Sequence, residues 1–145
     1  MKVQIHASCA SRDDAGVLLL GPAGSGKSDL LLRLIDRGFT LVADDRVELE
    51  TGMATPVPGL EGLVEMRGLG ILRLPYRAPV RLVLACELLA WEAAERPPRL
   101  PEPAWHRLGV PMVRLDARVS SAPLLVVHAL DCAQNRMEMH TGAFA

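Results

Sequence analysis

Hydrophobic and polar positions near the start of the chain follow the two-residue period of β-strands. Residues 2–6 alternate loosely between polar and apolar side chains, which predicts a short strand. The polar cluster at residues 11–16 then predicts a hairpin turn. Residues 17–20 form an unbroken apolar run of the kind that is buried on both faces of a sheet. These segments predict two strands joined by a turn.

The spacing of the apolar residues then changes from that of a strand to that of a helix. Leucine and isoleucine recur at helical spacing between residues 30 and 35, and charged residues occupy the opposite face. Gly38 follows at the position of a C-terminal cap. Residues 40–43 again have the apolar character of a strand. We therefore predict a strand, helix, strand unit with a right-handed crossover.

Short strands interrupted by turn residues dominate the rest of the chain. Residues 45–74 predict a β meander with a turn at Thr51-Gly52 and an irregular loop at residues 56–59. The remaining predicted elements are a strand over residues 79–88, a proline-rich loop over 95–103, a strand over 110–115, a helix over 123–132 that is opened by proline, and a frayed tail over 133–145. The pattern predicts one α/β domain over residues 1–145, with flanking helices and a mixed β-sheet.

Composition narrows the class of protein. Half of the 145 residues are hydrophobic and 23% are charged, which is typical of a globular domain and disfavours disordered, collagen-like and coiled-coil chains. The apolar runs are too short to span a bilayer and no charged leader precedes one, so we expect a soluble, cytoplasmic protein. A net charge of -1 offers no basic surface for nucleic acid or for a membrane. The three scattered cysteines fit small core residues in a reducing compartment.

One segment carries a specific chemical motif. Residues 21–28 match G-x-x-x-x-G-K-[ST], the phosphate-binding P-loop, between a predicted buried strand and a predicted amphipathic helix. Main-chain amides and the positive end of the helix dipole then face a polyphosphate such as that of ATP. The predicted nucleotide-binding residues are Gly21, Pro22, Ala23, Gly24, Ser25, Gly26, Lys27 and Ser28. In this interpretation Lys27 contacts the β and γ phosphates and Ser28 is a ligand of Mg²⁺. The alternative is a glycine-rich turn that binds nothing.

Two adjacent carboxylates follow the next predicted strand. Asp44 and Asp45 lie just beyond residues 40–43, at the carboxyl edge where α/β sheets present groups to a ligand. One of them can hold Mg²⁺ directly or through water, and the other can accept the proton of an attacking hydroxyl. The alternative is a solvated acidic turn.

A second polar group lies at residues 63–70. If residues 65 to 67 are extended, Glu65 and Arg67 share one face of the strand. The Glu65 carboxylate can then bind metal or substrate beside the Arg67 guanidinium, which can neutralise phosphoryl charge. A surface salt bridge is the alternative. His6 ends the first predicted strand, and on its own it fits an ordinary surface histidine as well as a catalytic one.

Taken together, these segments resemble the catalytic domain of the HPr kinase/phosphorylase family, whose members phosphorylate a serine of the phosphocarrier protein HPr. The resemblance extends from about Val3 to Leu130. It is carried by His6, the P-loop, the Ala-Asp-Asp-Arg-Val string at residues 43–47 and the Glu-Met-Arg-Gly-Leu-Gly string at residues 65–70. It implies a fold resembling phosphoenolpyruvate carboxykinase around the P-loop, and a homo-oligomer in the form of a hexamer.

The resemblance also implies roles for individual residues. Lys27 would contact phosphates, Ser28 and Glu65 would serve Mg²⁺, and His6 would belong to the active site. Asp45 would take the proton from the target serine, and in the reverse reaction the same carboxyl would act as the acid. The proposed partner is HPr or a related phosphocarrier protein, and the cofactors are ATP and Mg²⁺.

The sequence departs from the family pattern in three places. We expect a short form of the enzyme, without the family's usual N-terminal domain. An arginine of an Asp-Arg-Leu-Gly string has a counterpart only in His106-Arg107-Leu108-Gly109 or in Arg99. The segment tied to dephosphorylation retains only Arg118, so kinase activity is better supported than phosphorylase activity.

Two other functions are compatible with the motif. A P-loop kinase or NTPase with another acceptor would bind phosphate in the same way. A nucleotide-sensing regulatory module would bind without turnover.

Overall fold

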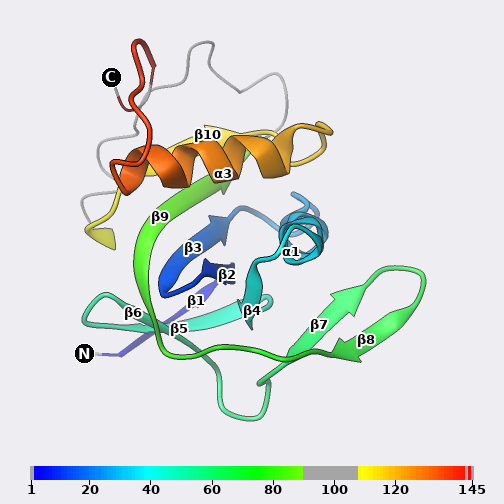
Figure 1. The fold of residues 1–145 in the computed structure, drawn as a ribbon. Helices are drawn as coiled ribbons and strands as arrows, with labels where there is room; N and C mark the ends of the chain where they lie inside the picture. The colour runs from blue at the N-terminus through cyan, green and yellow to red at the C-terminus, as the bar shows by residue number, and fades with distance from the viewer. Residues whose placement is uncertain (1, 90–107, 143, 145) are drawn as a thin grey trace.

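The computed structural model describes residues 2–89, 108–142 and 144, and within these ranges the chain folds around one mixed β-sheet (Figure 1). The helices are α1 (Lys27–Asp36) and α3 (Ala122–Ala133). The strands are β1 (Val3–His6), β2 (Ser8–Arg12), β3 (Ala15–Leu20), β4 (Thr40–Ala43), β5 (Arg46–Glu50), β6 (Met53–Pro56), β7 (Leu63–Met66), β8 (Gly70–Arg73), β9 (Val80–Leu88) and β10 (Met112–Leu115). The prediction of an α/β fold with a mixed sheet and flanking helices is confirmed.

The main sheet has the strand order β1-β5-β6-β9-β3-β2-β4, and β10 pairs with β9. Strands β3 and β10 run parallel to β9, whereas β2 is antiparallel to both of its neighbours, β3 and β4. It follows that β3 and β4 point in the same direction and that their carboxyl ends lie at the same edge of the sheet. The loop after β3 and the acidic turn after β4 are thereby brought to one edge, on either side of the start of β2.

Strands β1 and β2 together face β4 and β5 in an almost continuous antiparallel ladder. His6 pairs with Arg46 in one part of this ladder, and Cys9 pairs with Ala43 in the other. Between these pairs the regular pairing stops, at residues 7–8 and 44–45. Interruptions of this kind bend a strand and redirect its side chains, and they are common next to active sites.

Helix α1 begins directly after the loop that follows β3. Its end is fixed by a Schellman motif, in which Gly38 has a φ of 101°. The amide of Gly38 donates to the carbonyl of Ile35 at 3.0 Å, and that of Phe39 donates to Leu34 at 3.1 Å. Phe39 is buried in the core, which anchors the helix at this end. The predicted cap at Gly38 is confirmed.

Apolar side chains pack on both faces of the main sheet. The larger cluster joins α1 and α3 to strands β3, β9 and β10, and both helices lie on that face in Figure 1. The smaller cluster gathers side chains of β2, β4, β5 and β9. Within the described ranges, neither α1 nor α3 has the length and apolar character of a segment that crosses a membrane.

Most of the strands and both helices predicted from the sequence are present, but two predictions are wrong. The predicted turn is present at Asp13 and Asp14, but it joins β3 to β2, a strand that was not predicted, and not to the strand at the start of the chain. Arg67 does not lie in a strand beside Glu65, because β7 ends at Met66 and Arg67 belongs to the turn before β8. The predicted proline-rich loop at residues 95–103 lies outside the described residues, as do His106, Arg107 and Arg99.

Candidate functional site

The glycine-rich loop of residues 21–28 joins β3 to α1, and its conformation depends on glycine. Gly24 and Gly26 have φ values of 81° and 97°, in the left-handed region that other residues adopt at a cost. A Cβ on Gly21 would lie 2.5 Å from the Ser25 hydroxyl oxygen. Gly26 is the N-cap of α1, and no side chain caps this end of the helix within the described part of the chain. The first main-chain amides of α1 are therefore available to an anion.

The Lys27 side chain folds back onto the glycine-rich loop and binds its main chain. Its ammonium donates hydrogen bonds to the carbonyl oxygens of Gly21 at 2.6 Å and Pro22 at 3.1 Å, and its side chain is buried. The amide of Ser25 also donates to the Pro22 carbonyl, at 3.1 Å. A positive charge is thus held within the loop, beside the amides at the start of α1.

Asp44 is the centre of the polar contacts at this edge of the sheet. Its Oδ1 accepts hydrogen bonds from the hydroxyls of Ser28 at 2.7 Å and of Ser8 at 2.8 Å. Its Oδ2 accepts the main-chain amide of Glu65 at 3.1 Å. These donors come from α1, β2 and β7, so one half-buried carboxylate ties the loop helix, the sheet and the β7–β8 hairpin together.

The pair of Ser28 and Asp44 fits a magnesium site. Because the Ser28 hydroxyl donates its hydrogen to Asp44, its lone pairs remain available to a cation. Mg²⁺ in phosphotransfer sites is bound by few protein oxygens together with phosphate and water. Among the described residues there is no group of three or more His, Cys, Asp or Glu side chains that could hold a metal. The loop fits a phosphate ligand as well, since the buried Ser25 Oγ has no hydrogen-bond partner within the described residues.

Asp45 and His6 lie next to each other along the interrupted ladder. Asp45 is exposed and has a φ of 68°, which an Asp side chain tolerates in a turn. Its carbonyl accepts the amide of Ala7 at 3.1 Å, and Ala7 directly follows His6. His6 is also exposed, at the end of β1. The structure therefore brings these two predicted residues to one part of the surface, beside Asp44.

Glu65 and Arg67 differ in how they are connected to Asp44. Glu65 is joined to Asp44 through its own main-chain amide, and its side chain is exposed. Arg67 is exposed in the turn of the β7–β8 hairpin, and Leu69 of the turn and Ile71 of β8 are also exposed. Figure 1 shows this hairpin projecting from the body of the sheet below α1. Glu65 is thus part of the Asp44 hydrogen-bond network, and Arg67 is carried on the projecting turn.

The segment that follows β10, residues 116–119, lies against the glycine-rich loop and α1. This contact was not predicted from the sequence. Gly26 faces Ala117, because a Cβ on Gly26 would lie 3.1 Å from the Ala117 Cβ. Arg33 of α1 donates to the main-chain carbonyls of Ala117 and of Val119. Next to them, the Asp116 carboxylate accepts three hydrogen bonds from Arg118, at 2.9 to 3.0 Å. These bonds hold the pKa of Asp116 below its usual value, and they fix the Arg118 guanidinium next to the Asp116 carboxylate.

Sequence reasoning found Arg118 but missed Asp116 and Ser8. The Asp-x-Arg spacing of residues 116 and 118 is a weak signal, since an Asp side chain often accepts the amide two residues later. Ser8 carried no local signal, because its partner Asp44 is 36 residues away.

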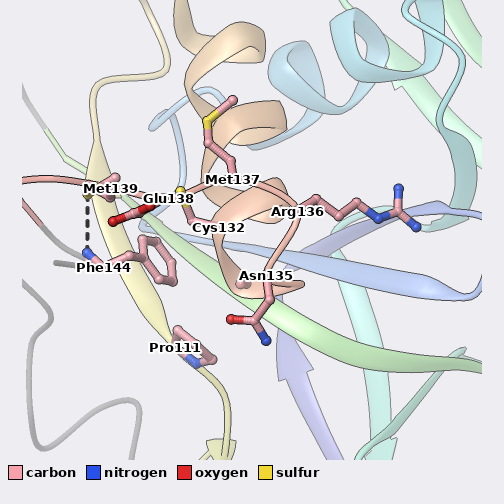
Figure 2. A pocket seen from close by; sticks show the side chains of 9 residues that line it. Pro111, Cys132, Asn135, Arg136, Met137, Glu138, Met139 and Phe144 are labelled. Carbon is pink, nitrogen blue, oxygen red and sulfur yellow. Dashed lines mark hydrogen bonds between the residues drawn. The ribbon is translucent and has the colours of Figure 1, made fainter.

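Two pockets lie away from these residues. Figure 2 shows a pocket of about 520 Å³ near the C-terminus, where the Phe144 amide donates to the Met139 sulfur at 3.3 Å. A second pocket, of about 640 Å³, is lined by residues of β1, β5 and β9 and by single residues of β3 and β10, most of them apolar. Neither pocket includes a residue of the loop or of the acidic turn.

Comparisons with known proteins point to one family. The family model described as the HPr Serine kinase C-terminal domain matches residues 1–115. An HPr kinase/phosphorylase of Bordetella pertussis is 36% identical over 126 residues, which cover 77% of this chain and 41% of the relative. An HPr kinase/phosphorylase of Azoarcus sp. is 35% identical over 141 residues, which cover 87% of this chain and 45% of the relative. The chain therefore spans less than half the length of these curated relatives.

A solved structure resembles nearly the whole chain. The Hpr(Ser) kinase/phosphatase from Coxiella burnetii aligns with a TM-score of 0.75 and 27% sequence identity. The alignment covers 94% of this chain and 99% of that chain. The architecture described above is therefore shared with that protein.

Proposed function

Since this chain belongs to the family of HPr serine kinase C-terminal domains, we propose that it is an ATP- and Mg²⁺-dependent kinase that phosphorylates a serine of HPr or of a related phosphocarrier protein. The observation that carries the proposal is the 2.7 Å hydrogen bond from Ser28 to Asp44 at the edge where the glycine-rich loop begins α1. A hydroxyl and a carboxylate joined in this way, beside free helix amides, suit a metal-bound polyphosphate.

In this proposal the loop and its cation bind the phosphates of ATP. The free main-chain amides of the glycine-rich loop and of the start of α1 would donate to the phosphate oxygens, and Lys27 would exchange its bonds to the Gly21 and Pro22 carbonyls for bonds to phosphate. Ser28, with Asp44 behind it and Glu65 beside it, would hold Mg²⁺. When bound, the metal supplies positive charge that neutralises the phosphates.

Asp45 is proposed as the base for the acceptor serine. Its exposed carboxylate takes the hydroxyl proton as the serine oxygen bonds to the γ-phosphorus, while the bond from that phosphorus to the β,γ-bridging oxygen breaks and ADP leaves. His6, at the same part of the surface, and Arg67, on the projecting turn, are proposed as further active-site residues. Most of the rate enhancement then comes from alignment and from neutralisation of charge.

Phosphate transfer to a defined acceptor tests the proposal. Purified protein is incubated with labelled ATP, Mg²⁺ and a panel of phosphocarrier proteins, and the label is located by mass spectrometry. We expect phosphoserine on a phosphocarrier. Label found only in a small molecule or in free phosphate would instead assign the chain to a P-loop kinase or NTPase with another acceptor.

The pair Asp45→Asn and Asp13→Asn separates catalysis from nucleotide sensing. Both residues are exposed aspartates with positive φ, but Asp13 lies at the opposite end of β2 and β3. We expect Asp45→Asn to abolish transfer while ATP binding is largely retained, and Asp13→Asn to behave as the parent protein. If the parent binds ATP and Asp45→Asn leaves every phosphate flux unchanged, the chain is a sensor module.

The proposal includes a hexamer in the cytoplasm. The hexamer rests on family resemblance, and light scattering of the purified chain measures it directly. Three free, buried cysteines are suited to a reducing compartment in which ATP is available.

A further inference from the structure

Ser8 holds the two consecutive aspartates of the site through one hydroxyl group. Its Oγ donates to Asp44 Oδ1 at 2.8 Å and accepts the main-chain amide of Asp45 at 3.2 Å. Ser8 is completely buried at the start of β2. We propose that Ser8 is a positioning residue for phosphate transfer, which sets the orientation of the metal-site carboxylate and of the proposed base together. This inference rests on the proposed function.

The position of Ser8 in the ladder explains why a hydroxyl is needed there. Regular pairing between β2 and β4 ends at Cys9 and Ala43, and pairing between β1 and β5 resumes at His6 and Arg46. In the gap, the Asp45 carbonyl still receives the Ala7 amide at 3.1 Å. The Asp45 amide donates to the Ser8 hydroxyl. A side chain thus accepts the main-chain hydrogen bond at the point where the acidic turn leaves the sheet.

The same hydroxyl also fixes the direction of the Asp44 carboxylate. Oδ1 of Asp44 receives hydrogen bonds from Ser8 and from Ser28, so these two hydroxyls reach one oxygen from β2 and from α1. Without the Ser8 hydroxyl, only the Ser28 hydroxyl and the Glu65 amide hold the carboxylate, so its rotation about the Cβ–Cγ bond is less restricted and the acceptor of the Ser28 hydrogen is less firmly fixed. Partners of this kind, behind the groups that contact a metal, typically change metal affinity or activity by about 10- to 100-fold when removed.

Ser11 provides a matched control on the same strand. It is also completely buried in β2, but its Oγ has no hydrogen-bond partner among the described residues. Ser11→Ala therefore removes the same atom from the same strand without contact with either aspartate. Ser8→Thr retains the hydroxyl, and Ser8→Val has nearly the same shape as threonine without it.

The test uses the full chain and two measurements. ATP binding is titrated with Mg²⁺ to obtain the half-saturating metal concentration, and kcat and KM are measured with the phosphocarrier that the parent protein phosphorylates. For Ser8→Ala we expect about a 10-fold higher half-saturating Mg²⁺ concentration, about a 10- to 100-fold lower kcat and a nearly unchanged affinity for ATP without metal. Ser8→Thr should remain within about threefold of the parent protein, and Ser11→Ala should match it.

Several outcomes would overturn the inference. The inference fails if Ser8→Ala keeps the Mg²⁺ dependence and the kcat of the parent protein. It also fails if Ser8→Ala and Ser11→Ala lose the same amount of activity, because strand packing would then be the cause. If Ser8→Ala does not fold, as judged by thermal unfolding, the comparison of Ser8→Thr with Ser8→Val replaces it. If the parent protein phosphorylates no phosphocarrier, the proposed function fails, while the Mg²⁺ titration of ATP binding still decides the role of Ser8. A chain that binds no nucleotide overturns both.

Discussion

Replacing Asp44 by asparagine isolates the hydrogen-bond network at the centre of the site, and its effect is measurable without any substrate. The carboxylate accepts from the hydroxyls of Ser8 and Ser28 on one oxygen and from the Glu65 amide on the other. An asparagine has one acceptor oxygen and one donor NH₂ group in the same places. If its oxygen faces the two serines, its NH₂ group meets the Glu65 amide, donor against donor.

The other orientation of the asparagine is no better. The NH₂ group then faces the hydroxyls of Ser8 and Ser28, and the hydrogens that they donate to Asp44 lose their acceptor. At least one hydrogen bond to a charged group is lost in either case, which costs about 1.5–3 kcal/mol of unfolding free energy. For a domain of this size, that loss lowers the thermal midpoint by about 3–10 °C.

Thermal unfolding followed by far-UV circular dichroism measures this shift in the absence of nucleotide and metal. Asp13→Asn is the control, since it removes the same charge from an exposed turn with positive φ. We expect the control to lie within about 0.5 kcal/mol of the parent protein, as is usual for surface substitutions. An Asp44→Asn midpoint equal to that of the control would refute the idea that three donors converge on the Asp44 carboxylate.

Two further predictions concern the loop cation and the thiols. Lys27→Ala removes the buried ammonium that now binds the Gly21 and Pro22 carbonyls. We expect the ATP affinity measured by calorimetry to fall by about 10- to 100-fold, as for the loss of a hydrogen bond to a charged group. An unchanged affinity would contradict phosphate binding by this loop. Burial raises the pKa values of Cys9 and Cys86 to about 12, so at pH 8 only about one thiol in ten thousand is ionised at each site. Neither thiol should react with Ellman's reagent until the protein is unfolded, and rapid labelling of either in the folded protein would contradict their burial.

The parts of the site that lie close together in the sequence could be predicted well. The glycine-rich loop and α1 are determined by local rules: glycines where φ is positive, apolar residues at helical spacing, and Gly38 at the helix end. The acidic turn could be placed at the correct sheet edge because it follows the next strand along the chain. Local patterns thus identified both halves of the site separately.

The contacts between those halves could not be predicted. Strand β2 consists of small and polar residues and ends in the turn, so it has no clear two-residue alternation. Without that strand, no local pattern placed Ser8 beside Asp44, although the two residues are hydrogen bonded. Arg67 was misplaced for a related reason, since the turn of the β7–β8 hairpin begins one residue earlier than the two-residue spacing suggested.

The place of β2 between β3 and β4 has a consequence for the dimensions of the site. Neighbouring strands in a sheet are about 4.8 Å apart, so β3 and β4 end at about twice that separation. Direct pairing of these two strands would halve the distance between the strand ends that carry the glycine-rich loop and the acidic turn. The intervening strand therefore acts as a spacer, and its first residue, Ser8, starts at the same edge between them.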